Sequence, residues 1–266
     1  MHDATRSRTP PRPVDNTDWL KTVAIICVSA GHFGFFFMDD EQWWSVFGRF
    51  AAPPFFFLVG YSQNRTVPFH WIWIGVILTL LESSNADWTW VAPNILLSLA
   101  LIRLARPYVQ MLMQRHGWAA FVLLVSTFLV VLPIAAKIVD YGAEGWLWAL
   151  FGLSHRLTLE AQHPHSRWTR DGLAAAAALV YTAKEILDHG FEGAESSVLA
   201  GLIAVLTLAL TLFRRTDLSW QPPEALAAVL RFSGRYSLEI YAATLLAMQI
   251  TAYAIEDPNA EDEIEG

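Results

Sequence analysis

Two ionisable side chains, Lys21 and His32, lie eleven positions apart within the first apolar segment of the chain. Eleven residues turn an α-helix through about three full turns and 20°, so both side chains share one face, about 16 Å apart along the axis. Ionisable residues inside a membrane span are rare, costly and usually functional. A cation near the start of the segment and an imidazole deeper in it predict a reaction site with a charged entrance, where a neutral His32 acts as general base. The alternative is an interfacial anchor at Lys21 and a packed, hydrogen-bonded His32.

The next apolar segment carries Arg49 and ends in a polar stretch. Arg49 keeps its proton and therefore needs an acceptor, unless it is an anchor that reaches the membrane interface. Pro53-Pro54 are expected to break the helix locally and to free backbone carbonyls. The polar residues at the end of the segment suit phosphate or adenine-ribose contacts, as well as an ordinary polar loop: Tyr61, Gln63, Asn64 and Arg65.

Further arginines, Arg103, Arg106 and Arg156, are predicted on the same side of the membrane as this polar stretch. Guanidinium groups bind phosphates through paired hydrogen bonds, although each arginine alone is also explained by membrane topology. His163-Pro-His165 is too short a motif for a metal site, and zinc spacings, phosphate-binding glycine loops and nucleophile elbows are absent from the sequence. No metal is therefore expected.

Three more polar residues, Asn94, Glu239 and Tyr241, fall within or near apolar segments. Each is a candidate partner for Arg49 or His32, and the sequence does not choose between them.

The composition is typical of a membrane protein. The 266 residues are 54% hydrophobic and only 16% charged, whereas soluble domains carry about 25% charged residues. Twelve Trp and sixteen Phe suit aromatic belts at the two membrane interfaces. The single cysteine, Cys27, excludes an internal disulfide, and the first residues lack the pattern of a secretory signal peptide. Nothing in this composition suggests nucleic acid as a partner.

The expected fold is an all-α polytopic membrane helix bundle with about nine transmembrane helices. The predicted spans are 19–38, 43–61, 68–81, 88–104, 117–136, 143–156, 171–187, 196–213 and 236–255. Residues 1–17 are expected to form a disordered cytoplasmic tail, 18–255 a single transmembrane domain, and 256–266 an acidic extracytoplasmic tail.

Loop charges set the predicted orientation. Basic residues cluster in every second loop, from Arg12 through Arg115 to Arg235, while the intervening loops are rich in Asp and Glu. The excess of Lys and Arg marks cytoplasmic loops, which predicts a cytoplasmic N-terminus, an external C-terminus and hence an odd number of spans.

Two stretches of the sequence resemble a known family. Asp18-Trp-Leu-Lys21 with His32, followed by Gly48-Arg49-Phe-Ala-x-Pro-x-Phe-Phe-Phe-Leu-x-Gly60-Tyr61, is similar to the TraX family, which itself resembles the type 3 membrane acyltransferases. In the latter group an Arg or Lys, ten residues and a His mark the first span, and Lys21 and His32 match that pattern. The resemblance is concentrated in residues 15–66. Ser233-Gly-Arg235-Tyr-Ser237-Leu-Glu239-Ile-Tyr241 is similar to the start of the acyltransferases' last span, where Thr244 stands in place of a frequent His.

The resemblance implies a membrane acyltransferase, with TraX-type N-acetylation of pilin or O-acetylation of a surface glycan as examples. Acetyl-CoA or another acyl-CoA would be the cosubstrate, an amine or hydroxyl of a peptide, glycan or lipid would be the acceptor, and the bacterial cytoplasmic membrane would be the location. His32 and Arg49 would be catalytic. Direct transfer and an acyl-histidine intermediate both stay open.

Two other classes of membrane protein also fit the sequence. In a membrane transporter or flippase, Lys21, His32 and Arg49 would form a path for protons or substrate. A membrane subunit without catalytic activity is the third reading.

Overall fold

The computed structural model describes residues 12–38, 41–64, 66–85, 92–160, 167–218 and 220–256. Within these ranges the regular structure is helical, with one isolated bridge between Asp15 and Asp217. The expected all-α fold is therefore confirmed. The described helices are α1 (Asn16–Phe37), α2 (Glu41–Arg49), α3 (Ala52–Tyr61), α4 (Phe69–Asn85), α5 (Ile95–His116), α6 (Trp118–Ile138), α7 (Gly142–Leu159), α8 (Arg167–His189), α9 (Gly193–Thr211), α10 (Glu224–Arg235) and α11 (Ser237–Glu256).

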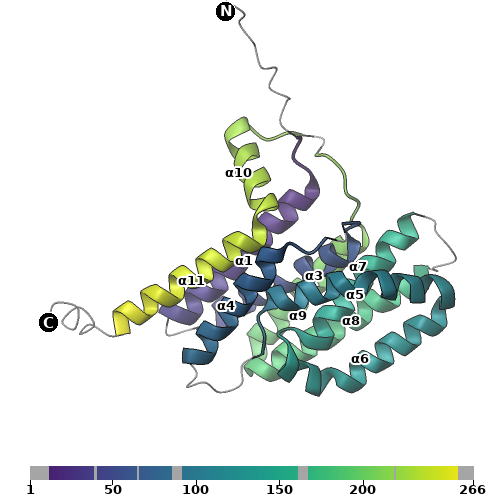
Figure 1. Cartoon of the computed structure of the whole chain (residues 1–266), viewed down its shortest axis with the longest axis horizontal. Helices are drawn as coiled ribbons and strands as arrows, with labels where there is room; N and C mark the ends of the chain where they lie inside the picture. Colours follow the sequence, from purple (N-terminus) through teal and green to yellow (C-terminus); the bar gives the residue numbers. More distant parts are fainter. Residues whose placement is uncertain are drawn as a thin grey trace, which may run out of the picture.

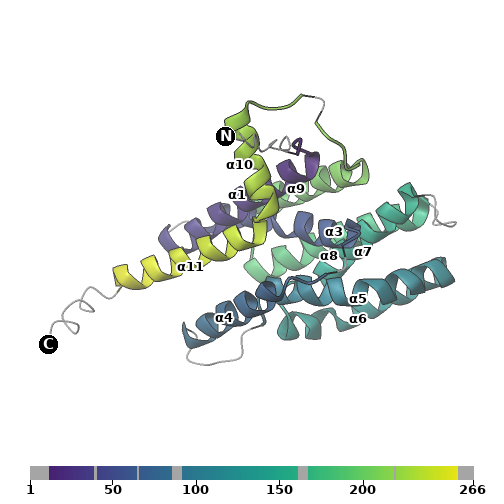
Figure 2. The same cartoon turned by 45° about the horizontal axis from the view of Figure 1, so that its top comes forward.

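The helices form two groups that meet at the centre of the molecule. Helices α1, α4 and α11 extend together toward one side, and α5 to α9 make up the other group (Figures 1 and 2). Helix α7 packs against α3, α6 and α8, and α1 packs against α2, α10 and α11. Helix α10 stands out beside the start of α1 (Figure 1).

The short helix α3 is the centre of the core. Every residue from Ala52 to Gly60 is buried, and the rings of Phe57 and Phe151 join α3 to α7 with centroids 5.0 Å apart. A Cβ on Gly60 would overlap the carbonyl of Ala149, and one on Gly152 would overlap the carbonyl of Phe57. The two backbones can approach this closely only because both positions are glycine.

The second predicted span, 43–61, is two helices rather than one. Helix α2 ends at Arg49 and α3 begins at Ala52, with the Pro53-Pro54 pair in its first turn. Proline is tolerated in the first turn, where its missing N–H leaves no carbonyl unpaired, but not in a helix interior. The expected local break is therefore present, just before the prolines.

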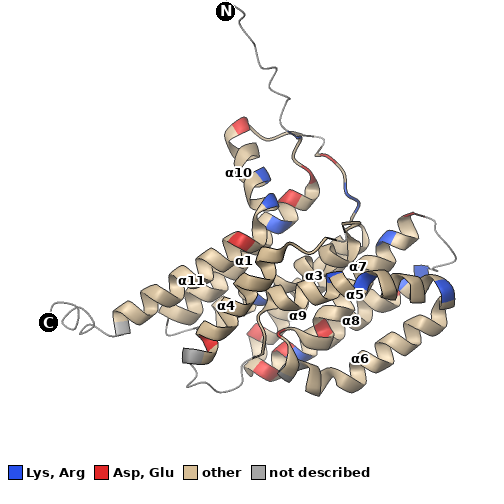
Figure 3. Cartoon of the chain, in the orientation of Figure 1, with Lys and Arg blue, Asp and Glu red and all other residues tan. Residues whose placement is uncertain are grey.

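Among the described residues, five helices are long and apolar enough to cross a membrane. These segments are Asn16–Phe37, Ile95–His116, Trp118–Ala135, Gly193–Thr211 and Ser237–Ile255, and Phe69–Ser83 is a shorter apolar helix. Figure 3 shows long stretches without charge along α6 and α11. The count of nine spans and the orientation stay predictions, because the other predicted segments form helices that are shorter or carry more charge.

Two expectations about the chain's peripheral parts need correction. Residues 12–17 were expected to be disordered, but Val14 and Asp15 are buried and Asp15 caps α1. The Asp15 side chain accepts from the backbone N–H of Asp18, whose side chain accepts from that of Asp15, a reciprocal cap that fixes the segment. Helix α10 was not predicted, because its apolar residues follow an amphipathic rather than a continuous pattern. The tail after residue 256 lies outside the described residues.

Candidate functional site

A cavity of about 1170 Å³ opens where the first helix meets the last two. Its wall is formed by the starts of α1, α4 and α11, the ends of α3, α7 and α10, and the middle of α5. The structure brings most of the predicted acyl-CoA residues to this wall: Lys21, Tyr61, Gln63, Asn64, Arg103 and Arg156. Arg65 lies outside the described residues, and Arg106 is buried behind the wall.

The cavity is strongly basic. Seven Lys and Arg side chains line it against four Asp and Glu. Four of the basic residues were not among the predicted site residues: Arg12, Arg215, Arg231 and Arg235. From the sequence these residues were assigned only to the cytoplasmic side. Assigning them to the site requires knowing that the segment before α1 packs beside the segment that leads into α10.

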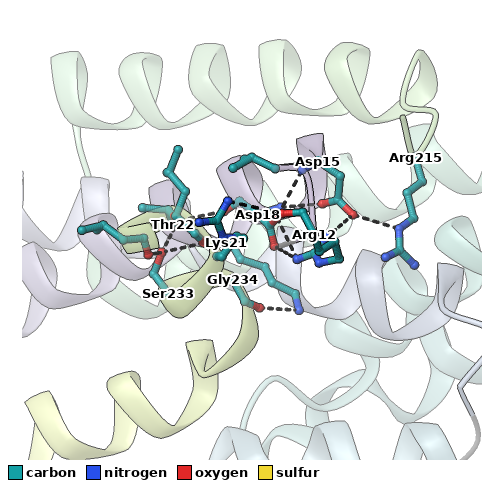
Figure 4. A network of polar contacts seen from close by, with 12 residues as sticks. Arg12, Asp15, Asp18, Lys21, Thr22, Arg215, Ser233 and Gly234 are labelled. Atoms are coloured by element: carbon teal, nitrogen blue, oxygen red, sulfur yellow. Dashed lines mark hydrogen bonds and ion pairs between the residues drawn. The ribbon is translucent and has the colours of Figure 1, made fainter. Parts of the chain in front are cut away.

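An ion-pair network fixes the rim formed by the segment before α1 (Figure 4). Arg12 bonds to Asp15 at 2.9 Å and to Asp18 at 2.8 Å, and Arg215 bonds to Asp15 at 3.1 Å. Burial would lower the pKa of Arg12, but its hydrogen bond to Asp18 and the charges of both carboxylates raise that pKa above its usual value. Asp15 and Asp18 therefore have cationic partners, which leaves the other basic residues of the cavity to set its charge.

Lys21 is held at the junction of α10 and α11. Its Nζ donates to the carbonyl of Gly234 at 2.9 Å, and the neighbouring Thr22 hydroxyl lies 2.5 Å from that of Ser233 (Figure 4). A Cβ on Gly234 would overlap the Asp18 carboxylate, so this crossing requires glycine. The ammonium group has three donors, and one hydrogen bond leaves the others to face the cavity.

Two of the predicted arginines support the polar stretch after α3. Arg156 donates to the carbonyl of Ser62 at 2.8 Å, and Arg106 donates to that of Gln63 at 3.2 Å. The Gln63 side chain in turn donates to Glu160 at 2.8 Å. These contacts hold the end of α3 in place and give both arginines a positioning role.

Two aromatic rings on the cavity wall each have an arginine guanidinium stacked over them. Arg103 lies over the ring of Trp71 at 4.5 Å and also donates to the carbonyl of Thr66 at 3.0 Å. Arg235 lies over Tyr236 at 5.3 Å. Such pairs place a positive charge beside a flat ring, which suits a ligand that has both anionic and aromatic parts.

His32 lies three turns further along α1 than Lys21 and does not line the cavity. Its Nδ1 is buried and has no hydrogen-bond partner among the described residues. The ring of Tyr241 lies 5.6 Å from that of His32, and the Tyr241 hydroxyl accepts from Asn94 at 3.2 Å. Asn94 and Tyr241 thus bond to each other, and Tyr241 rather than Asn94 contacts His32.

Arg49 has partners other than those considered from the sequence. Its Nε lies 3.5 Å from Glu185, one of its terminal nitrogens donates to Tyr141 at 3.1 Å, and its carbonyl accepts from Tyr181 at 2.6 Å. Arg49 is therefore a half-buried side chain that pairs with Glu185. The sequence could not reveal Glu185, because α8 is far from α2 along the chain.

Glu239 also differs from its expected role. Its carboxylate bonds to His70 at 2.7 Å and to the indole of Trp71 at 3.4 Å, at the cavity wall. It pairs with neither Arg49 nor His32, because it lies at the start of α11, one end of the bundle.

A contact between two glycines joins the helices that carry His32 and Arg49. A Cβ on Gly31 would lie 2.7 Å from the Cα of Gly48, so α1 and α2 touch backbone to backbone. His32 and Arg49 each follow the glycine at this contact. His32 and Arg49 therefore each lie one residue from the point where the two helices touch.

The described residues contain no group of three or more His, Cys, Asp or Glu side chains that could hold a metal ion. The site is thus composed of basic, aromatic and hydroxyl groups, with an imidazole deeper in the helix. Basic groups of this kind can bind anions, and an imidazole can accept and donate a proton.

The described residues form a helical bundle with five apolar helices of membrane-spanning length and a basic cavity at one end. These features are those of an integral membrane protein. A family model described as TraX protein matches residues 16–225, and the chain belongs to the TraX family. The match extends well beyond the stretch from which the resemblance was inferred, and it ends before Ser233–Tyr241. No curated protein and no solved structure matches the chain.

Proposed function

We propose that this protein is an acyltransferase that takes an acetyl or other acyl group from acyl-CoA and transfers it to an amine or hydroxyl. The observation that supports this most is the basic cavity at the start of the helix that carries His32. The acceptor belongs to a membrane-associated or external peptide, glycan or lipid. Pilin N-acetylation, as associated with TraX, is one such reaction.

The cavity suits the nucleotide end of CoA. Ligand pockets usually measure about 300–1000 Å³, and this cavity of about 1170 Å³ has room for a large donor. Lys21, Arg103 and Arg235 provide positive charge for the diphosphate and 3′-phosphate, because their contacts among the described residues are with carbonyls and aromatic rings rather than with carboxylates. The adenine would stack beside Tyr236 or Trp71. Arg235 already lies over the ring of Tyr236, and Arg103 lies over that of Trp71.

The reaction then takes place further along α1. The acceptor nitrogen or oxygen attacks the thioester carbonyl while Nδ1 or Nε2 of His32 removes its proton. The carbon–sulfur bond breaks, and CoA thiolate leaves and recovers that proton. An acyl-histidine intermediate is the other route, in which the imidazole itself attacks first.

Arg49 would stabilise the negative charge that forms on the carbonyl oxygen. Glu185 and Tyr141 orient the guanidinium through Nε and one terminal nitrogen, and neither contact uses Nη2. The contact between Gly31 and Gly48 supports this assignment, since His32 and Arg49 are the next residues along α1 and α2.

The proposed topology keeps the N-terminus and the cavity on the cytoplasmic side, where acyl-CoA is made. Nine crossings result if α2 and α3 together form one broken crossing and α10 lies at the interface. The acyl acceptor would then approach His32 from the opposite side or from within the membrane.

Purified full-length protein and labelled acetyl-CoA would test the enzyme directly. We expect saturable acetyl-CoA hydrolysis or transfer, and mass spectrometry of envelope fractions with and without the protein should reveal an acyl group that depends on it. The protein with Ala in place of His32 is the control. Substrate uptake into proteoliposomes without any acyl transfer would refute the proposal and favour the transporter.

A further inference from the structure

A second hollow lies between α8 and α9, with a volume of about 950 Å³. Of the residues that line it, only Leu159 also lines the basic cavity. We call this hollow the α8–α9 groove. The proposed transfer reaction does not use it.

One end of the groove is basic. Arg167 and Arg170 lie in the first turn of α8, and Arg214 follows the end of α9. The two helices pack together, so the start of α8 and the end of α9 bring these three side chains to the same mouth. Only one acidic residue lines the groove, Asp171, and it pairs with Arg170 at 2.6 Å.

The rest of the groove is mostly apolar. Its wall includes Ala174, Ala175 and Ala178 on α8, and Ala204, Thr207 and Leu208 on α9. From Arg170 to Ala178 the helix rises about 12 Å, so the apolar part extends about that far along α8. Such a shape suits an extended hydrocarbon chain.

A buried nitrogen at the mouth lacks a partner. His155 is 1% exposed and lines the groove, and its Nε2 lies 2.6 Å from the carbonyl of Phe213. That carbonyl can only accept, so Nε2 carries the proton and Nδ1 is an acceptor. Nδ1 is buried with no partner among the described residues, which suits a ligand with a hydroxyl group.

The largely exposed side chain of Trp168 indicates the depth at which the mouth lies in the membrane. It is 81% exposed beside Arg167, at the polar start of α8. Tryptophan is enriched at the membrane–water interface, where its ring lies among head groups. The mouth is therefore at head-group depth, and the apolar part of the groove runs toward the hydrocarbon core.

We propose that the α8–α9 groove binds an anionic phospholipid with a hydroxyl-bearing head group, such as phosphatidylglycerol. The phosphate lies among Arg167, Arg170 and Arg214, one acyl chain lies along the alanines of α8, and a head-group hydroxyl donates to Nδ1 of His155. Basic pockets between membrane helices are recurrent sites for anionic lipid head groups.

Native mass spectrometry of the full-length protein in a neutral detergent tests the proposal, with phosphatidylglycerol and phosphatidylcholine of identical chains as probes. We expect at least tenfold tighter binding of phosphatidylglycerol. The triple variant Arg167→Gln, Arg170→Gln, Arg214→Gln should weaken its binding by about a hundredfold, since each of the three charges contributes about fivefold. Arg115→Gln removes an exposed charge outside the groove and should leave binding unchanged.

Filling the groove provides a second variant that keeps every charge. Ala178→Phe should also weaken phosphatidylglycerol binding by tenfold or more, whereas Ala209→Phe, on an exposed position of α9 outside the groove, should not. Equal binding of the two lipids, or undiminished phosphatidylglycerol binding in the triple variant, would overturn the proposal. So would binding of palmitoyl-CoA that depends on the three arginines when lipid binding does not, because the groove would then hold an acyl donor.

Discussion

Replacing Lys21 by Met should weaken the binding of acyl-CoA without weakening that of the acceptor. Lys21 lines the basic cavity and uses one of its three donors on the carbonyl of Gly234, so the others can reach a phosphate oxygen. A hydrogen bond between charged groups contributes about 1.5–3 kcal/mol, which corresponds to about a ten- to hundredfold rise in the apparent KM for acyl-CoA. Lys21→Arg should restore part of the affinity, because it keeps the charge.

The same residue also anchors α10, and a matched variant separates the two effects. Thr22 contacts Ser233 beside the Lys21 contact, so Thr22→Val loosens the same helix junction without removing a charge. Initial rates at varied acyl-CoA and fixed acceptor give both KM values for each variant. An unchanged KM for acyl-CoA in Lys21→Met would remove Lys21 from the donor site. An equal rise in Thr22→Val would show that helix docking, and not charge, is responsible.

Four further predictions follow from the same structure. His32→Ala should insert normally and lower acyl transfer by about 10²–10⁴-fold, and wild-type transfer should fall at acidic pH because imidazolium accepts no proton; near wild-type rates would exclude the base. Glu185→Ala should cost about 3 kcal/mol of stability in detergent, since Arg49 then lacks its carboxylate; an unchanged melting temperature would contradict the pairing. Gly60→Ala should destabilise the protein by more than about 2 kcal/mol because α7 backbone occupies the space, whereas Gly201→Ala meets open space and should be tolerated. A reporter after the last residue should be active outside the cytoplasm, and activity only inside would refute the nine-span topology.

Helix periodicity and charge counting predicted which residues line the basic cavity better than they predicted the partners of Arg49 and His32. Lys21, Gln63, Arg103 and Arg156 were assigned to one membrane side from the loop charges, and they do line one cavity. That inference needs only the direction of each helix. It could not separate a cavity-facing side chain such as Lys21 from a supporting one such as Arg156, because the difference depends on which carbonyls fold back nearby.

Side-chain pairs between helices that are distant in the sequence could not be predicted from the sequence. Arg49 required an acceptor, but the choice of Glu185 over Glu239 depends on how α2 meets α8. The start of α1 could have been predicted from the sequence. Asp15 is followed three residues later by Asp18 at the start of an apolar run, which is a helix-capping pattern. It would have placed the start of α1, and with it the ordered segment from residue 12.

The mouth of the basic cavity joins the two ends of the chain. The backbone of Val14 and Asn16 pairs with Leu218 and Thr216, and Lys21 bonds to Gly234. Chains begin to fold from the N-terminus while they are still being synthesised. The rim formed by the N-terminal segment therefore stays incomplete until α10 and α11 have been made, and a ribosome-bound chain that lacks them has no closed basic cavity. Any activity that depends on this cavity should begin only once these two helices have been made and packed.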